Sequence, residues 1–229
     1  MSTIATNIAK VGARIREAAQ ASTREAESVG LLAVSKTQPA EAIREAFDAG
    51  LRDFGENYLQ EALEKQADLA DLPLRWHFIG PIQSNKTKAI AEHFDWVHSV
   101  DRLKIAQRLS EQRPDALGPL NICIQVNVSG EASKSGCSPE AVAALAETIA
   151  TLPRLRLRGL MTIPAPTENP VEQRQAFARL RRLKETLGAD LDTLSMGMSQ
   201  DLEAAIAEGA TWVRIGTALF GAREYGRSA

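Results

Sequence analysis

Short apolar runs alternate along this chain with segments in which apolar residues recur every three or four positions. Runs of four to eight apolar residues are typical of strands buried on both faces, whereas the longer periodic segments are typical of amphipathic helices. We therefore predict eight strands, each followed by a helix or a helix-like turn. The predicted strands cover residues 30–36, 52–57, 75–80, 95–100, 121–128, 157–163, 191–197 and 211–216.

The segment before the first run has its own helical pattern. Ile4, Ile8, Val11 and Ile15 lie on one face of a helix that we predict over residues 3–27. Because this face is apolar, we expect the helix to pack on the outside of the domain as a structural cap.

Two later helices have recognisable ends. The helix predicted over 139–151 begins with a proline and follows Ser138, which is a suitable N-cap residue. The helix predicted over 172–187 ends at Gly188, a residue type that commonly terminates helices.

Alternation of strands and helices predicts a parallel sheet in the α/β class. Eight strands are the number that closes into a (β/α)8 TIM barrel, and 229 residues suit one such domain. A doubly wound open sheet usually has a glycine-rich turn after its first strand, but the turn here, 35–38, contains no glycine. We therefore expect residues 1–229 to form one barrel domain, with residues 1–28 as an additional N-terminal helical segment.

Composition narrows the classes of partner. Hydrophobic residues make up 44% of the chain and aromatic residues 5%, so the core must be mainly aliphatic. The 27 basic and 29 acidic residues give a net charge of −2, which favours neither nucleic acid nor a membrane surface as partner.

No segment has the apolar length of a membrane span or of a secretory signal. The two cysteines, Cys123 and Cys137, are too few for a disulfide framework, so we expect a cytoplasmic protein. No spacing of His, Cys and Asp indicates a metal site.

Functional groups of such barrels lie where strands end at their carboxyl side, and Lys36 follows the first strand there. A lysine projecting into the barrel mouth is partly desolvated, which lowers the pKa of its amine and favours attack on carbonyl groups. A solvated lysine, or one paired with a carboxylate, is the alternative.

A second group of polar residues follows the seventh and eighth strands. Ser199 lies before a helix predicted to begin near Gln200, and Gly216 and Thr217 follow the last strand. Free N–H groups at helix starts suit a phosphate, and barrels commonly bind phosphate in these two loops. Ordinary helix capping and turn formation are the alternative for the same residues.

Closure of a barrel would bring these two groups together, because it makes the first and last strands neighbours. An amine and a phosphate site would then share one mouth, which suits a molecule that carries both an aldehyde and a phosphate. Pyridoxal phosphate is such a molecule. Arg214 could meet its pyridine nitrogen as a permanent cation and keep that nitrogen unprotonated, or could form a salt bridge within the mouth.

The chain resembles the family of pyridoxal phosphate homeostasis proteins, relatives of the alanine racemase barrel. The matching stretches run from one end of the chain to the other, and their combination is specific although each alone is weak. They are AVSKTQP (33–39), FGENYLQE (54–61), WHFIGPIQSNK (76–86), VNVSGEASKSGC (126–137), GLMTIP (159–164), LSMGMSQD (194–201) and VRIGTALFG (213–221).

This resemblance implies a barrel of the fold-type III class of pyridoxal phosphate proteins and a role for each site residue. Lys36 would hold the cofactor as a Schiff base, Asn57 would line the cofactor face, and Arg214 would meet the ring nitrogen. Ser199 would bind the phosphate together with the backbone of Gly216 and Thr217.

Three further residues are candidates for the cofactor site. Met196 and Met161 would pack near the cofactor, although methionines at strand ends are more often core residues. His77 matches the family pattern too, and a satisfied core histidine is the alternative for it.

Family members resemble cofactor carriers, so we expect an intracellular homeostasis protein with little or no turnover and with no established catalytic residue. Apo-enzymes that require the cofactor would be transient acceptors. Alanine racemases place a tyrosine from a second domain opposite the lysine. Here the chain ends shortly after the eighth strand and its only tyrosines are Tyr58 and Tyr225, the latter in a tail that we expect to be mobile. We expect a monomer for the same reason.

Two alternatives remain at this point. One is an amino-acid racemase-like enzyme that depends on pyridoxal phosphate. The other is an aldolase or phosphosugar isomerase that uses the lysine without the cofactor.

Overall fold

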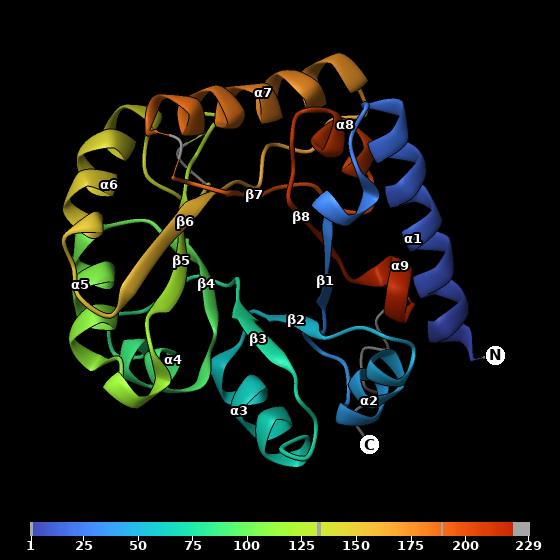
Figure 1. The fold of residues 1–229 in the computed structure, drawn as a ribbon, viewed down its shortest axis with the longest axis horizontal. Helices are drawn as coiled ribbons and strands as arrows, with labels where there is room; N and C mark the ends of the chain where they lie inside the picture. The colour runs from blue at the N-terminus through green and yellow to red at the C-terminus, as the bar shows by residue number, and fades with distance from the viewer. Residues whose placement is uncertain (1, 132–133, 189, 222–229) are drawn as a thin grey trace.

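A closed barrel of parallel strands forms the centre of the molecule. The computed structural model describes residues 2–131, 134–188 and 190–221, and Figure 1 shows their strands arranged in a ring with helices around it. Each strand pairs with its neighbours in sequence, and β1 pairs with β8 to close the barrel. The strands are β1 (Gly30–Val34), β2 (Asp53–Glu56), β3 (Arg75–Phe78), β4 (Trp96–Val100), β5 (Leu120–Gln125), β6 (Leu155–Met161), β7 (Thr193–Ser195) and β8 (Trp212–Ile215).

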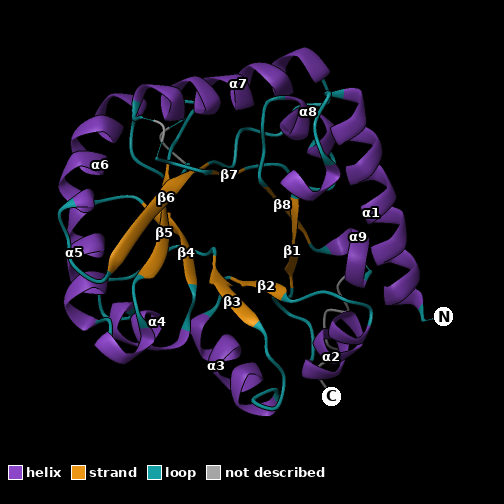
Figure 2. Ribbon diagram, viewed as in Figure 1, coloured by secondary structure: helices purple, strands orange, loops and turns teal. Residues whose placement is uncertain are grey.

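Helices form the outer layer, as Figure 2 shows by secondary structure. The α-helices are α1 (Thr3–Ala21), α2 (Ala40–Asp48), α3 (Leu59–Asp68), α4 (Thr87–His93), α5 (Leu103–Gln112), α6 (Val142–Ala150), α7 (Pro170–Thr186), α8 (Leu202–Ala207) and α9 (Thr217–Phe220). The short 3-10 helices are η1 (Ala26–Ser28), η2 (Asp115–Leu117) and η3 (Pro139–Ala141). The main apolar core lies between the strands and this layer, and Phe54, Ile122 and Phe177 are among its fully buried residues.

These observations confirm the predicted barrel. All eight strands lie inside or within two residues of the runs that the apolar pattern predicted. The predicted helix over 172–187 appears as α7, in which Asn169 caps the first turn by accepting the N–H of Val171 at 3.0 Å. The helix predicted over 139–151 begins instead as the 3-10 turn η3 and continues as α6.

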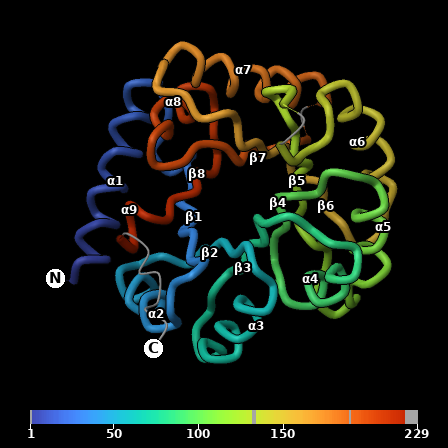
Figure 3. The backbone as a smooth tube through the Cα atoms, turned by 180° about the vertical axis from the view of Figure 1, so that it is seen from behind, coloured from blue at the N-terminus to red at the C-terminus, as the bar shows by residue number. Residues whose placement is uncertain are grey.

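The N-terminal helix α1 ends at Ala21, six residues before its predicted end, and packs against α8 and α9 (Figure 3). Arg14 forms an ion pair with Glu203 on α8 at 2.8 Å and donates to the backbone oxygen of Ser199 at 2.9 Å. Asn7 donates to the backbone oxygen of Leu219 on α9 at 3.0 Å. The helix therefore supports the segments that follow the seventh and eighth strands.

No helix in the described ranges has the length and apolar character that crossing a bilayer requires.

Polar and aromatic side chains fill much of the barrel interior. The ring of His77 on β3 lies edge-on to that of Trp212 on β8, with centroids 5.3 Å apart. His98 on β4 contacts Ser195 on β7 at 2.7 Å. Because neither pair lies on neighbouring strands, these side chains must meet inside the ring. Barrel interiors are usually filled by branched aliphatic residues, so this polar filling is a distinctive feature of the chain.

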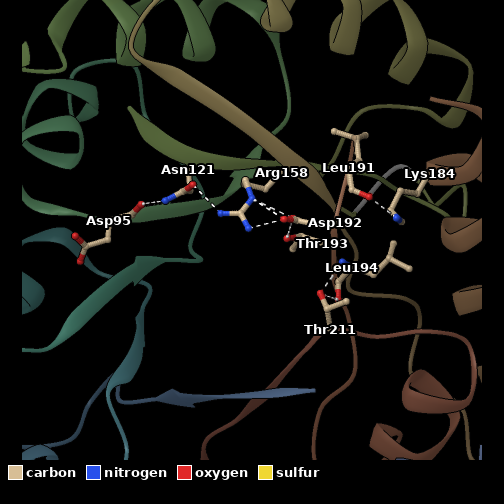
Figure 4. Close-up of polar contacts among 9 residues, drawn as sticks. All are labelled: Asp95, Asn121, Arg158, Lys184, Leu191, Asp192, Thr193, Leu194 and Thr211. Carbon is tan, nitrogen blue, oxygen red and sulfur yellow. Dashed lines mark hydrogen bonds and ion pairs between the residues drawn. The ribbon is translucent and has the colours of Figure 1, made fainter. Parts of the chain in front are cut away.

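Contacts of Arg158 connect neighbouring strands at the amino-terminal end of the barrel, as Figure 4 shows. Arg158 on β6 pairs with Asp192 at 2.6 Å and donates to Asn121 on β5 at 3.0 Å. Its guanidinium also lies over the ring of Trp96, 4.8 Å from the centroid. In barrels of this kind the amino-terminal end serves stability, which leaves the opposite end for binding.

Candidate functional site

A cavity of about 640 Å³ opens at the carboxyl ends of the strands. Six residues that the sequence predicted for the site line it: Lys36, Asn57, Ser199, Arg214, Gly216 and Thr217. They come from the ends of β1, β2, β7 and β8, so the closure of the barrel gathers them as expected.

Lys36 lies in a turn two residues beyond the end of β1. Successive side chains of a strand alternate between its faces, and both Val34 and Lys36 line the cavity whereas Ser35 is fully buried. Thr37 follows with a φ of 65°, a left-handed conformation that non-glycine residues seldom adopt. Its N–H donates to the carboxylate of Glu61 at 2.5 Å. A contact from α3 thus holds the turn that presents Lys36.

A buried ion pair supports the same turn from outside the barrel. The Lys65 amine on α3 donates to Glu56 on β2 at 2.9 Å, to the backbone oxygen of Ser35 at 2.7 Å, and to Glu61. Ser35 in turn donates its hydroxyl to Glu56 at 2.6 Å. Burial raises the pKa of Glu56, although Lys65 and Ser35 oppose that shift. Such a pair costs desolvation energy, so we interpret it as a device for position and not as a source of net stability.

Asn57 offers a buried polar atom to the cavity. Within the described part of the chain, its side-chain Oδ1 is buried and has no hydrogen-bond partner. Gly80, in the loop after β3, packs directly against the backbone of Asn57 and helps to hold it in place. The approach is so close that a Cβ at position 80 would lie 2.3 Å from the Asn57 carbonyl oxygen. Buried polar atoms without partners are rare and costly, so this one indicates a bound group.

The expected anion site differs in one respect from the sequence prediction. The helix predicted to begin near Gln200 is α8, which begins at Leu202 with Asp201 in the N-cap position. The sequence misplaced this start because Asp201 accepts the N–H of Met198 at 2.6 Å and so extends the turn. Ser199 therefore reaches the cavity from a turn.

The loop after β8 supplies backbone donors to the same region. Gly216 is the N-cap of α9 and Thr217 its first residue. The first N–H groups of a helix have no acceptor within it. A Cβ on Gly216 would lie 3.2 Å from the backbone oxygen of Val34, so glycine allows this loop to approach the end of β1 closely.

Arg214 places a buried cation at the base of the cavity. Its Nη1 donates to the hydroxyl of Ser195 at 2.9 Å and its Nη2 to the backbone oxygen of Thr162, also at 2.9 Å. Burial lowers the pKa of Arg214 to about 10, with Asp201 opposing the shift, so the guanidinium remains charged at neutral pH.

The remaining three candidates do not line the cavity. Met196 packs in the main core, Met161 lies in a small cluster with Trp96 and Cys123, and His77 is fully buried inside the barrel. Met198 lines the cavity instead. Tyr58 is exposed, and Tyr225 lies outside the described residues.

Sequence reasoning also missed one wall of the cavity. Ile163, Pro164, Pro166 and Thr167 line it from the loop after β6. The rule that site residues follow strands would have found them, since they lie at the end of the sixth apolar run or just after it. Ile163, Pro164 and Pro166 are apolar, so their side chains gave no chemical signal in the sequence.

Together these groups suit a small molecule with a reactive carbonyl and an anionic end. The amine of Lys36 can attack a carbonyl, the loops of Ser199 and Gly216 can hold an anion, and Arg214 and Asn57 offer polar contacts between them. Across the described ranges, no group of three or more His, Cys, Asp or Glu residues could hold a metal ion.

Comparisons with known proteins agree with this geometry. The family model described as "Alanine racemase, N-terminal domain" matches residues 7–224. The "Pyridoxal phosphate homeostasis protein" of Pseudomonas aeruginosa is 76% identical, over the whole of both chains. PipY of Synechococcus elongatus, solved with pyridoxal phosphate bound, superposes with a TM-score of 0.83 at 41% identity, covering 95% of this chain and all of that one. The alanine racemase of Corynebacterium glutamicum has a TM-score of 0.71 at 18% identity, covering 96% of this chain and 61% of that one, which concerns the fold alone.

Proposed function

This chain belongs to the family of pyridoxal phosphate homeostasis proteins, within the wider family of the alanine racemase N-terminal domain, and from that premise we propose that it binds pyridoxal phosphate through Lys36. The observation that carries the proposal is that the cavity brings the Lys36 amine, the buried Arg214 cation and the Ser199 and Gly216 loops into one space. The partnerless Oδ1 of Asn57 also fits a bound polar molecule.

When bound, pyridoxal phosphate supplies an aldehyde that condenses with a lysine amine. In this proposal Lys36 is the point of covalent attachment. Ser199 and the backbone of Gly216 and Thr217 hold the phosphate, and Arg214 meets the ring nitrogen as a hydrogen-bond donor. Because Arg214 stays charged, it keeps a proton off that nitrogen, which weakens the ring as an electron acceptor.

We infer a role in homeostasis of the cofactor, in which the protein binds and releases it with little or no turnover. The names of the relatives support this function, and the weakened electron acceptor gives it a chemical reason. A racemase-like activity is the second candidate, supported by the shared barrel fold. We further propose a cytoplasmic monomer that passes the cofactor to apo-enzymes; both cysteines are free, which agrees with a reducing compartment.

The test is to locate the covalent attachment. The protein is incubated with pyridoxal phosphate, reduced with borohydride, digested and analysed by mass spectrometry. We expect the added mass on Lys36, none in Lys36→Ala, and an unchanged result in Lys86→Ala, whose lysine is exposed and lies outside the cavity. Modification that persists at another lysine in Lys36→Ala, or is absent from the native protein, would contradict the proposal.

A further inference from the structure

An unbroken series of buried hydrogen bonds crosses the barrel interior and ends at Arg214. The Asp53 carboxylate on β2 lies 3.0 Å from His77 Nε2, and His77 Nδ1 lies 3.0 Å from His98 Nε2. His98 Nδ1 lies 2.7 Å from the Ser195 hydroxyl, which accepts from Arg214 Nη1 at 2.9 Å. We call these five residues the interior chain.

The two ends of the interior chain determine the direction of every bond in it. An ionised Asp53 can only accept, so His77 must carry its proton on Nε2. A neutral His77 then has a bare Nδ1, and His98 must donate to it from Nε2. His98 Nδ1 is bare in turn and accepts the proton of Ser195, whose oxygen receives the N–H of Arg214. All four bonds therefore point from the cation to the carboxylate.

Both histidines are held neutral by their surroundings. Burial lowers the pKa of His77 against the opposing effect of Asp53 and Asp95, with Arg75 acting in the same direction as burial. Burial also lowers the pKa of His98, and His77 and Arg214 reinforce that shift. Burial raises the pKa of Asp53, but hydrogen bonds from Arg75 and His77 outweigh this and lower it to about 2.

The interior chain does not have the properties of a catalytic device. Its order resembles that of a hydrolase triad with a second histidine between the carboxylate and the serine, yet Ser195 is fully buried and does not line the cavity. It also cannot relay protons at neutral pH, because Arg214, with a pKa of about 10, keeps its proton there.

We propose that Asp53, His77, His98 and Ser195 are positioning residues, which fix the guanidinium of Arg214 for contact with the ligand in the cavity. This inference rests on the proposed binding of pyridoxal phosphate. A buried guanidinium whose N–H groups lack acceptors is strongly disfavoured, and Ser195 and Thr162 supply two of them. At the other end of the interior chain, Asp53 forms an ion pair with the exposed Arg75 at 2.6 Å. This ion pair anchors the interior chain at the opposite end of the barrel.

Histidine NMR tests the direction of the bonds without any cofactor. The chain has three histidines, and the third, His93, is exposed and provides an internal reference. In 15N-histidine-labelled protein freed of pyridoxal phosphate, we expect His77 and His98 as neutral Nε2–H tautomers at pH 7.5. An Nδ1–H tautomer or a charged ring at either buried position would overturn the proposed chain.

Substitution of Ser195 tests the positioning role. Ser195→Ala removes the acceptor of Arg214 and the donor to His98, so we expect affinity for pyridoxal phosphate to fall about tenfold, the effect of one hydrogen bond to a charged group. We also expect the NMR signal of His98 Nδ1 to shift, because that nitrogen loses its donor while His98 Nε2 still donates to His77. Ser110→Ala is the matched control, because Ser110 is a buried serine that donates to a backbone oxygen far from the cavity, at Pro153. Equal affinities of the two variants would overturn the proposal.

The two proposals fail in different ways. A native protein that binds no pyridoxal phosphate contradicts the proposed function. The histidine spectra would still show whether the hydrogen bonds of the interior chain have the proposed directions. If Ser195→Ala does not fold, Asp53→Asn removes the charge at the other end with little change in volume. We expect weaker binding and mixed tautomers of His77 in that variant, and native affinity together with native tautomers would overturn the positioning role.

Discussion

Two buried acidic side chains on β2, Asp53 and Glu56, each begin a set of contacts that leads towards a basic residue of the cavity. Glu56 faces outward and bonds Ser35 and Lys65, beside the turn that carries Lys36. Asp53 lies at the other end of the strand and begins the interior chain that ends at Arg214. The cations are thus held by contacts from both sides of the barrel wall.

Removing one partner of the buried ion pair between Lys65 and Glu56 should strongly lower the stability of the fold. Lys65→Met leaves the Glu56 carboxylate buried without its counter-ion, and we expect the free energy of unfolding to fall by about 3–5 kcal/mol. Urea denaturation measures the loss. Lys88→Met removes an exposed ion pair with Glu92 and should cost less than about 1 kcal/mol. If the free energy of unfolding fell no more in Lys65→Met than in Lys88→Met, the buried Glu56 carboxylate would not depend on Lys65 as its counter-ion.

The buried histidines should make stability depend on pH. Burial lowers the pKa of His77 and His98 below the value of about 6.5 that histidine has in unfolded chains. Their contribution is therefore complete above about pH 6.5. As the pH falls below that value, the unfolded state takes up protons that the folded state does not, so the free energy of unfolding decreases by up to about 1.4 kcal/mol per pH unit for each histidine.

Urea denaturation at pH 7.5 and pH 5.5 measures this effect. The same free energy of unfolding at both pH values in the native protein would contradict the neutral state of the buried rings.

At the scale of elements, the apolar pattern predicted the barrel well because strands buried on both faces have a distinctive sequence. It located β1 and β8, whose pairing brings Lys36 and Arg214 to the lining of one cavity. It failed at turns, where single side chains decide the outcome: Asp201 delays α8 by accepting the N–H of Met198. The contacts of His98 and Ser195 were beyond its reach too, because β4 and β7 are not neighbours and their meeting depends on the closed ring.

The turn between β7 and α8 offers a prediction about a single glycine. Gly197 has a φ of 97°, and a Cβ there would lie 2.5 Å from the Cβ of Ala205 on α8. Gly50 has a φ of 105°, and a Cβ there would have no atom of the described residues within 4 Å. Gly50→Ala should therefore cost only the backbone strain of about 1–2 kcal/mol. Gly197→Ala should cost about 1–3 kcal/mol more through overpacking.

Thermal and urea denaturation compare these two variants. We also expect Gly197→Ala to weaken binding of pyridoxal phosphate, because Gly197 leads the chain from β7 to Ser199, whereas Gly50→Ala should bind it as the native protein does. Equal losses of stability and unchanged affinity in both would contradict the steric role of Gly197.

Across the whole molecule, the two ends of the barrel are built for different purposes. Arg158 ties β5 and β6 to the start of β7 at the amino-terminal end, where Figure 4 shows its contacts. The other end holds the cavity, and α1 supports two of its loops through Arg14 and Asn7. The interior chain connects the two ends. A cavity that is already open at the end of the barrel suits binding and release of a cofactor better than a reaction that requires closure around a substrate.

This organisation bears on the racemase-like alternative. Racemisation by two bases requires a proton acceptor on each face of the substrate. The ionisable side chains that line the described cavity are Lys36, Lys134, Asp201 and Arg214, and tyrosine, histidine and cysteine are absent from that lining. Asp201 already accepts the N–H of Met198 at 2.6 Å, and this structural contact makes it a poor candidate for a second base at the ring.

We therefore expect no interconversion of L- and D-alanine above the rate given by free pyridoxal phosphate. Proton NMR in deuterated water measures both exchange at Cα and the appearance of the opposite enantiomer, with the cofactor alone at equal concentration as the control. Slow exchange without inversion fits a single amine, Lys36, acting on one face. Inversion at a catalytic rate would require a second base, and Asp201→Asn would then show whether it is the acidic residue of the cavity.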